Sequence, residues 1–520
     1  MKIKLFHSKF TPFYLFLISM FLFSLNSWEV SIFSLDEAKN ASCAREMLER
    51  KDLVVPTFNY ELRTDKPPVH YWFMMLAYEI FGVSEFSARF FSAFFGTMTV
   101  LITFLFGENF LSRKVGLISA FILLSSVHFT FQFHMAVPDP YLVFFLTSAF
   151  YSFYGFYQDR KEIFLYLFFL SMGLAFLTKG LIGLVLPSLI VITFLIIRRD
   201  VGFLRNMKLH IGIPIVLGVS LPWYIAVGLE TDWLWIKEFI FKHNINRFSD
   251  PMEGHRGSFI LTYLFMFVGM LPFSIFLLQV IKFVWTERKD PLLLYLSLVV
   301  MIYTTFFAIS KTKLPNYTVP VYPALSILIG TYLYRLNLGR SKAAYSLLFY
   351  VILSILLVWA LYTLLGEDKH LFLLKEFSLY FLTLTVGGVF SLYFLFKKEM
   401  LKIIISLGLS GILMSVILYT TVLPMIDRES SVRALLQQMD SSRSVGYYKR
   451  YNPAFSFYIR KKIEPLNSLE DVKRFIERKD VYILTREEYL QELEGLELKV
   501  LGKKKDLFEN PISVLLTNKE

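Results

Sequence analysis

Long apolar runs alternate with short polar segments along most of the chain, and this pattern predicts helices that cross a membrane. A membrane helix needs about 20 mostly apolar residues. We predict about thirteen spans by that criterion, near residues 11–25, 87–107, 115–133, 140–157, 163–177, 181–197, 211–229, 259–284, 292–309, 317–333, 343–365, 377–395 and 403–423. The expected fold class is therefore a polytopic α-helical membrane protein.

The pattern changes near residue 425, where apolar runs shorten and charge rises. The segments "SVGYY", "VYILT", "LELKVLG" and "SVLLTN" have the composition of strands. Ser468-x-x-Asp471 and Thr485-x-x-Glu488 are typical of helix starts. We therefore expect a transmembrane domain over residues 1–424 and a soluble α/β domain over residues 425–520.

Basic residues gather in alternate loops, and this asymmetry predicts the orientation of the chain. Lysine and arginine collect on the cytoplasmic side of membrane proteins. We therefore expect the N-terminus inside, the C-terminal domain outside (periplasmic), and residence in the cytoplasmic membrane. Of 520 residues 55% are hydrophobic, and the formal charge of +12 is explained by the cytoplasmic loops, so no nucleic-acid partner is implied. One cysteine excludes an intramolecular disulfide.

The first outer loop, residues 26–86, contains two short amphipathic segments. Ser34-x-x-Glu37 predicts a helix beginning at about Leu35, and "VHYWFMMLAYEIFG" predicts a second one. Both are too short to span the membrane, so we expect interfacial helices. Between them lies "YELRTDKPP", where two prolines stiffen the backbone. We expect this turn to present Asp65 and Lys66 along the membrane surface.

Several other outer loops carry charges that the orientation rule does not require. Asp139 lies in "MAVPDP", Lys179 in "LTKG", and Lys313 with Tyr317 in "SKTKLPNY". Each lysine alone is explained by an ammonium reaching the headgroups, and Tyr317 by an aromatic anchor. Together they place an acid and several cations at one surface, which indicates a functional site.

The second long outer loop, residues 230–258, adds further candidates. Arg247 has a guanidinium fork that matches phosphate oxygens. His243 and His255 are ordinary histidines as a sequence signal, although imidazole is a common metal ligand.

These motifs together resemble a known family. "SLDEAKNASCAREMLERKD", "RTDKPPVHYW", "MAVPDP", "LTKGLIGLVLP", "HNINRF", "GHRGSF" and "SKTKLPNYTVPVYPAL" occur here in that order over roughly residues 35–324. In this order they are similar to those of the aminoarabinose transferases and protein O-mannosyltransferases. These are polyprenyl-phosphate-dependent membrane glycosyltransferases of the GT-C fold.

The resemblance implies a reaction and a set of site residues. An inverting transferase would move an aminoarabinose-like pentose or a hexose from a polyprenyl-phosphate donor at the outer membrane face. The acceptor would be lipid A, a protein or a related molecule, with membrane lipids around the enzyme. The implied catalytic residues are Asp36 and Asp139. The implied donor-phosphate ligands are Lys66, Arg247, Tyr317, Arg63 and Lys313. Further implied substrate contacts are Glu37, Lys179 and His255.

The resemblance also implies a divalent, zinc-like metal that Asp65 and His243 would share; no other cofactor is implied. The chain departs from many aminoarabinose transferases at three positions. They carry Glu where Asp65 stands, Arg where Lys39 stands and, in some cases, a phosphate-contacting Tyr where Arg63 stands. Arg63 would replace that contact by charge.

Residue properties alone leave simpler alternatives open. Asp36 and Glu37 lie in a first helical turn, where acids interact favourably with the helix dipole. A lipid flippase or transporter is the main rival class, but transporters place ionisable groups near the bilayer midplane and often have inverted repeats. A non-catalytic scaffold would leave the outer charges unexplained.

Overall fold

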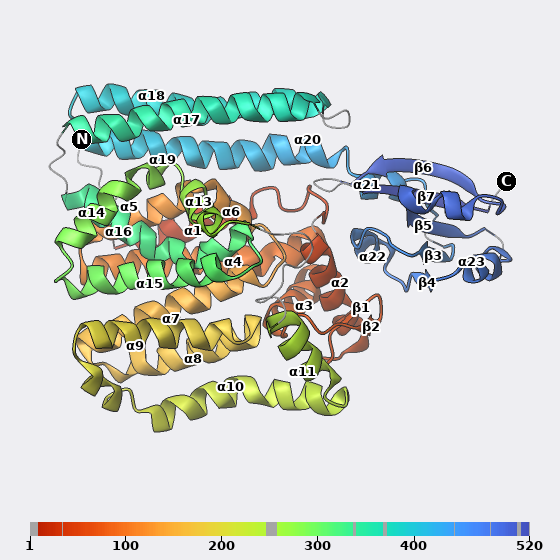
Figure 1. The fold of residues 1–520 in the computed structure, drawn as a ribbon, viewed down its shortest axis with the longest axis horizontal. Helices are drawn as coiled ribbons and strands as arrows, with labels where there is room; N and C mark the ends of the chain where they lie inside the picture. Colours follow the sequence, from red (N-terminus) through yellow and green to blue (C-terminus); the bar gives the residue numbers. More distant parts are fainter. Residues whose placement is uncertain are drawn as a thin grey trace.

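Most helices lie side by side in a bundle, and a small domain with a β-sheet sits at one end of it (Figure 1). The computed structural model describes residues 9–33, 35–245, 257–335, 340–367, 372–440, 442–478, 480–506 and 511–518. The first outer loop and the C-terminal domain occupy the same end of the bundle (Figure 1).

Each predicted span coincides with one or more helices. These are α1 (Thr11–Ser24), α4 (Glu85–Phe110), α5 (Arg113–Ser125), α6 (Val127–Phe133), α7 (Asp139–Asp159), α8 (Glu162–Lys179), α9 (Ile182–Ile197), α10 (Leu209–Glu230), α13 (Phe259–Gly269), α14 (Leu277–Thr286), α15 (Pro291–Ile309), α16 (Tyr322–Arg335), α17 (Arg340–Glu367), α18 (Leu382–Phe396), α19 (Met400–Ile417) and α20 (Leu423–Asp427). Within the described residues seven helices are long and apolar enough to cross a membrane, or up to nine if each bent pair counts once. The number thirteen stays a prediction.

Two predicted spans are broken rather than continuous. The α5–α6 pair bends by 74° and the pair 259–269 and 273–286 by 115°. Ser126 leaves the helix in an extended conformation and caps α6, while Pro272 has no backbone donor to continue α13. The two breaks meet, because the Ser126 hydroxyl donates to the Gly269 carbonyl at 2.5 Å.

The first outer loop forms α2 (Leu35–Arg50), a hairpin of β1 (Thr57–Phe58) and β2 (Glu61–Leu62), and α3 (Val69–Phe81). Both helices begin where the sequence predicts. The interfacial prediction is wrong for α2, because most of the helix is buried in protein, polar Arg45 and Glu46 included, and only its ends, such as Glu49 and Arg50, are exposed. In contrast, α3 exposes Leu76, Ile80 and Phe81, an apolar edge of the kind that interfacial helices lay on lipid.

The C-terminal residues form a five-stranded sheet of order β4-β3-β5-β7-β6. Its strands are β3 (Val445–Tyr448), β4 (Glu464–Leu466), β5 (Tyr482–Arg486), β6 (Lys499–Lys505) and β7 (Ile512–Thr517). β3 pairs in parallel with β4 and β5, whereas β7 is antiparallel to β5 and β6. The helices are α21 (Ser431–Leu436), α22 (Ala454–Ile459) and α23 (Leu469–Ile476).

One of the two predicted helix starts in this region is present and the other is wrong. Ser468 and Asp471 form a reciprocal capping box at α23. Thr485 instead lies inside β5, where it pairs with Val514 and donates to the Tyr448 carbonyl at 3.1 Å. The sheet ladder therefore takes the backbone groups that a helix would need, and two short 3-10 turns follow.

Candidate functional site

Three helical segments bring an acid, a lysine and an amide together at the outer-loop end of the bundle. Asp139 begins α7, Lys179 ends α8, and Asn316 lies in a 3-10 segment, η5 (Pro315–Val321). Asp139 Oδ1 accepts from Lys179 Nζ at 2.7 Å and from Asn316 Nδ2 at 3.1 Å. The side chains of Asp139 and Lys179 are 8% and 14% exposed. Among the described residues nothing bonds Oδ2, which leaves one carboxylate oxygen for a substrate.

Tyr317 lies beside Lys179, whereas Lys313 donates to backbone carbonyls instead of to Asp139. The Lys179 ammonium is 5.3 Å from the centre of the Tyr317 ring, which also packs on Phe307. Lys313 donates to three carbonyls at the end of α15, at 2.5–3.1 Å. The Lys313 ammonium therefore stabilises a helix C-terminus, which is the ordinary position for a cation.

A second group of charges is built on the proline-stiffened turn. Arg63 donates to both oxygens of Asp65, at 2.5 and 3.0 Å, and to Asn40 Oδ1 of α2 at 2.9 Å. The Trp235 indole donates to the Arg63 carbonyl at 2.8 Å. Lys66 is buried, with 7% of its surface exposed. The expectation that the turn presents Lys66 along the membrane surface is therefore wrong, while the Asp65 side chain is 20% exposed and both its oxygens are bonded by Arg63.

Two buried donors or acceptors in this group have no protein partner. Arg63 Nη1 and His70 Nδ1 are both buried without a hydrogen bond in the described structure. An unsatisfied buried polar group is costly and calls for a missing partner. For a guanidinium that partner must be an acceptor, and a phosphate oxygen satisfies this requirement.

His70 connects the two groups electrostatically. Burial, followed by the positive charges of Arg63 and Lys66, holds its pKa well below the ordinary value, and Lys179 acts in the same direction. The ring centre of His70 is 6.4 Å from that of Tyr141, which lies two residues after Asp139. The imidazole is therefore neutral, and the cations Arg63, Lys66 and Lys179 act on it against the single acid Asp65.

The Asp65 carboxylate does not suit a shared metal. Both of its oxygens are bonded by Arg63, and this neighbour holds the pKa of Asp65 far below its usual range. His243 approaches the Thr64 hydroxyl at 3.4 Å. No group of three or more histidine, cysteine or acidic side chains within the described ranges is arranged to hold a metal.

Glu37 and Asp36 are adjacent in sequence but differ in environment. Asp36 is exposed at the start of α2. Glu37 is fully buried, accepts from Arg89 at 2.8 and 3.0 Å, and accepts from the Ala136 backbone at 3.0 Å. This geometry suits positioning of the segment before Asp139 rather than contact with a substrate.

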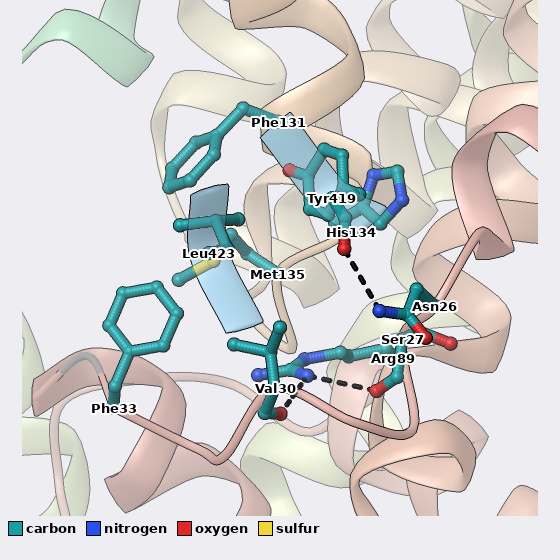
Figure 2. Close-up of a pocket in the computed structure, with 10 residues that line it drawn as sticks. All are labelled: Asn26, Ser27, Val30, Phe33, Arg89, Phe131, His134, Met135, Tyr419 and Leu423. Atoms are coloured by element: carbon teal, nitrogen blue, oxygen red, sulfur yellow. Dashed lines mark hydrogen bonds between the residues drawn. The ribbon is translucent and has the colours of Figure 1, made fainter. Parts of the chain in front are cut away.

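The surroundings of Arg89 support that interpretation. Figure 2 shows its guanidinium directed at the carbonyls of Ser27 and Val30, which it reaches at 2.9 and 2.7 Å. The adjoining cavity measures only about 10 Å³, and His134 stacks on Tyr419 at its wall (Figure 2). That space matches about one water molecule and excludes a sugar.

Sequence analysis missed some members of the site and named others that stay untested. Asn40, His70 and Asn316 are ordinary polar residues in sequence, and only their convergence identifies them. Asn316 could have been found in the "KLPNY" turn already singled out. Arg247 and His255 lie outside the described residues.

The amino-acid sequence is similar to a known family and to individual proteins. A family model described as dolichyl-phosphate-mannose-protein mannosyltransferase matches residues 65–225. An uncharacterised protein of Aquifex aeolicus is 33% identical over 317 residues, which cover 61% of this chain and 72% of that protein.

Two better described proteins are also similar. An undecaprenyl phosphate-alpha-4-amino-4-deoxy-L-arabinose arabinosyl transferase of Yersinia pestis is 31% identical over 330 residues, 61% of this chain and 58% of that relative. The match thus spans less than two thirds of that relative. The crystal structure of ArnT from Cupriavidus metallidurans bound to undecaprenyl phosphate superposes with a TM-score of 0.84 at 19% identity, covering 98% of this chain and 99% of that chain. At this identity the likeness shows a shared fold.

Proposed function

We propose, since the chain belongs to the GT-C superfamily of polyprenyl-phosphate-dependent membrane glycosyltransferases, that it transfers a sugar from a polyprenyl-phosphate donor to lipid A or a related acceptor. The sugar is an aminoarabinose-like pentose or a hexose. The reaction takes place at the outer face of the cytoplasmic membrane. The transmembrane domain, residues 1–424, carries it out, and residues 425–520 lie outside.

One observation carries this proposal. A buried carboxylate with a free oxygen, on Asp139, lies in the same positive region as a buried arginine with an unpaired N–H, on Arg63. A glycosyl transfer from a lipid phosphate needs both: a group that handles the acceptor and cations that stabilise the leaving phosphate.

The bond changes follow from this arrangement. The acceptor oxygen attacks the anomeric carbon from the face opposite the phosphate, and the bond from that carbon to the phosphate oxygen breaks. The configuration inverts, and polyprenyl phosphate leaves with both bonding electrons. Arg63 and Lys66 stabilise the charge on the leaving phosphate, with Tyr317 as a hydrogen-bond donor. Arg247 is a further candidate for the same phosphate, whereas the three carbonyls that Lys313 bonds take all of its N–H donors.

The acid Asp139 has a role that depends on the acceptor. For a hydroxyl acceptor, Oδ2 accepts the proton while Lys179 and Asn316 hold Oδ1 in place. For a phosphate acceptor no base is required, and Asp139 orients the acceptor. Asp36, exposed at the same end, is the second candidate acid.

The description of the matching family model favours a second acceptor class, a protein hydroxyl. A protein acceptor requires the proton transfer to Asp139, whereas a lipid A phosphate does not. The two acceptors therefore differ in how strongly they depend on this carboxylate.

Purified protein given an undecaprenyl-phosphate-linked aminoarabinose, with lipid A in one assay and a protein hydroxyl acceptor in another, tests the proposal. We expect the variant Asp139→Asn to lose at least about 100-fold in kcat for a hydroxyl acceptor, which is the usual contribution of a general base. Asp159→Asn, at the exposed far end of the same helix, is the control and should transfer at the wild-type rate. Equal rates for both variants on every acceptor would show that Asp139 has no part in transfer.

A further inference from the structure

The C-terminal domain makes a two-way hydrogen bond with the hairpin of the first outer loop. Asn59 Nδ2 donates to the Ile463 carbonyl at 2.9 Å, and the Ile463 N–H donates to Asn59 Oδ1 at 2.8 Å. The Asn59 side chain is buried. An amide that uses both its donor and its acceptor on one backbone residue fixes the two segments in register.

The hairpin is held to α2 by one buried acid. Glu46, fully buried, accepts from the Thr57 hydroxyl at 2.7 Å and from the backbone N–H groups of Asn59 and Tyr60 at 2.8 and 2.9 Å. The adjacent Arg45 donates to the Ser456 carbonyl of α22 at 3.3 Å. The hairpin, α2 and the C-terminal domain thus form one hydrogen-bonded unit.

Apolar packing extends this unit. A single cluster of buried side chains joins Ala41 and Met47 of α2 to Phe455 and Ile463 of the C-terminal domain. Figure 1 shows α22 beside α2. The interface between α2 and the C-terminal domain is therefore buried and apolar, as the interior of a single domain is.

The same hairpin leads directly into the charged turn. β2 ends at Leu62, and the Arg63 N–H donates to the Pro56 carbonyl at 2.9 Å. The Arg63 side chain then reaches Asn40, which lies on the same helix as Glu46. A shift of the hairpin relative to α2 would therefore move the guanidinium.

We propose that the C-terminal domain is a positioning element for the donor phosphate, and that Asn59 is the positioning residue through which it acts. The domain holds the hairpin against α2, and the hairpin sets where Arg63 and Lys66 meet the phosphate. This inference rests on the proposed function for its substrate. Asn59 itself does not touch the donor.

Three variants distinguish the effect of the Asn59–Ile463 hydrogen bonds from an effect on general stability. Asn59 has φ of 54°, a left-handed conformation that glycine adopts without strain. Asn59→Gly therefore removes both side-chain hydrogen bonds without straining the backbone. Asn59→Asp keeps the acceptor for the Ile463 N–H and loses the donor. Lys462→Ala is the control, because it removes only an exposed ion pair with Glu61 between the same two segments.

Kinetics on an undecaprenyl-phosphate-linked sugar give the first readout. We expect the donor KM to rise about tenfold in Asn59→Gly and by a smaller factor in Asn59→Asp, since a net hydrogen bond changes affinity by roughly that factor. The kcat should fall as well, because Arg63 and Lys66 also stabilise the charge on the leaving phosphate. Lys462→Ala should match the wild type. If Asn59→Gly changed neither KM nor kcat, the proposal would be overturned.

Hydrogen exchange gives a readout that needs no substrate. In Asn59→Gly the amides of residues 57–66 should exchange faster than in the wild type and in Lys462→Ala. Unchanged amide exchange in Asn59→Gly would overturn the proposal that the C-terminal domain holds the hairpin through Asn59. If the wild type consumed no lipid-linked sugar, the proposed function would fail, whereas the exchange experiment would still decide whether the domain holds the hairpin.

Discussion

At the scale of single residues, the environment of an acid decides which role it can have. Asp36 and Glu37 are neighbours in the chain, yet only Asp36 is exposed. Glu37 is committed to Arg89 and to the Ala136 N–H. Removing one partner of such a buried pair costs about 3–5 kcal/mol, so Glu37 belongs to the framework that places Asp139.

His70 provides a pH-dependent prediction. Its folded-state pKa lies well below the ordinary value because of burial and the nearby cations. The unfolded chain takes up a proton below about pH 6.5 that the folded protein does not, so this residue lowers stability as pH falls through that value. We expect His70→Gln to reduce the loss of thermal stability between about pH 7.5 and 5.5.

The unfolding midpoint in detergent, measured across that pH range, checks this prediction. His210→Gln is the matched control, since His210 is exposed on α10. Identical pH slopes for His70→Gln and the wild type would contradict the assignment of a buried neutral imidazole.

Charged residues of the candidate site are easier to predict from sequence than neutral ones. Asp139, Lys179 and Arg63 stand out because charge is unusual near a membrane. His70, Asn40 and Asn316 do not, because isolated polar residues are common in loops. Whether a charge is free or already paired, as for Lys313 on the end of α15, depends on contacts that no local pattern encodes.

At the level of elements, the break between α5 and α6 lies in close backbone contact with α19. The carbonyl of Ser125, beside the α5–α6 break, lies 2.1 Å from where a Cβ on Gly411 of α19 would stand. Only glycine fits there. The apolar pattern predicted the helical region 115–133 correctly, but it could not show this break, because hydropathy does not report which neighbour takes the freed backbone groups.

This approach gives a prediction on stability. Gly411→Ala should destabilise the protein by about 1–3 kcal/mol, the usual cost of overpacking. Gly218→Ala in α10 is the control, because a Cβ at Gly218 meets no atom within 4 Å. Thermal denaturation in detergent distinguishes them. Equal midpoints for the two variants would contradict the close contact between α19 and the α5–α6 break.

At the scale of the whole molecule, residues about 400 apart in sequence meet at one end of the bundle. Asn59 with Ile463, and Ser31 with Asp427 at 2.9 Å, join the first outer loop to the C-terminal region. The sequence patterns indicated both regions separately. Their contact could not be predicted, because neither segment has a local sequence pattern that indicates a partner about 400 residues away.

Transfer of sugar from a lipid phosphate, as proposed, and movement of lipid across the bilayer release different products. The most direct measurement uses liposomes containing the protein, an undecaprenyl-phosphate-linked sugar labelled in both sugar and phosphate, and lipid A. We predict that one polyprenyl phosphate is released for each sugar that appears on the acceptor. Movement of intact donor between leaflets, with no released polyprenyl phosphate, would contradict the account.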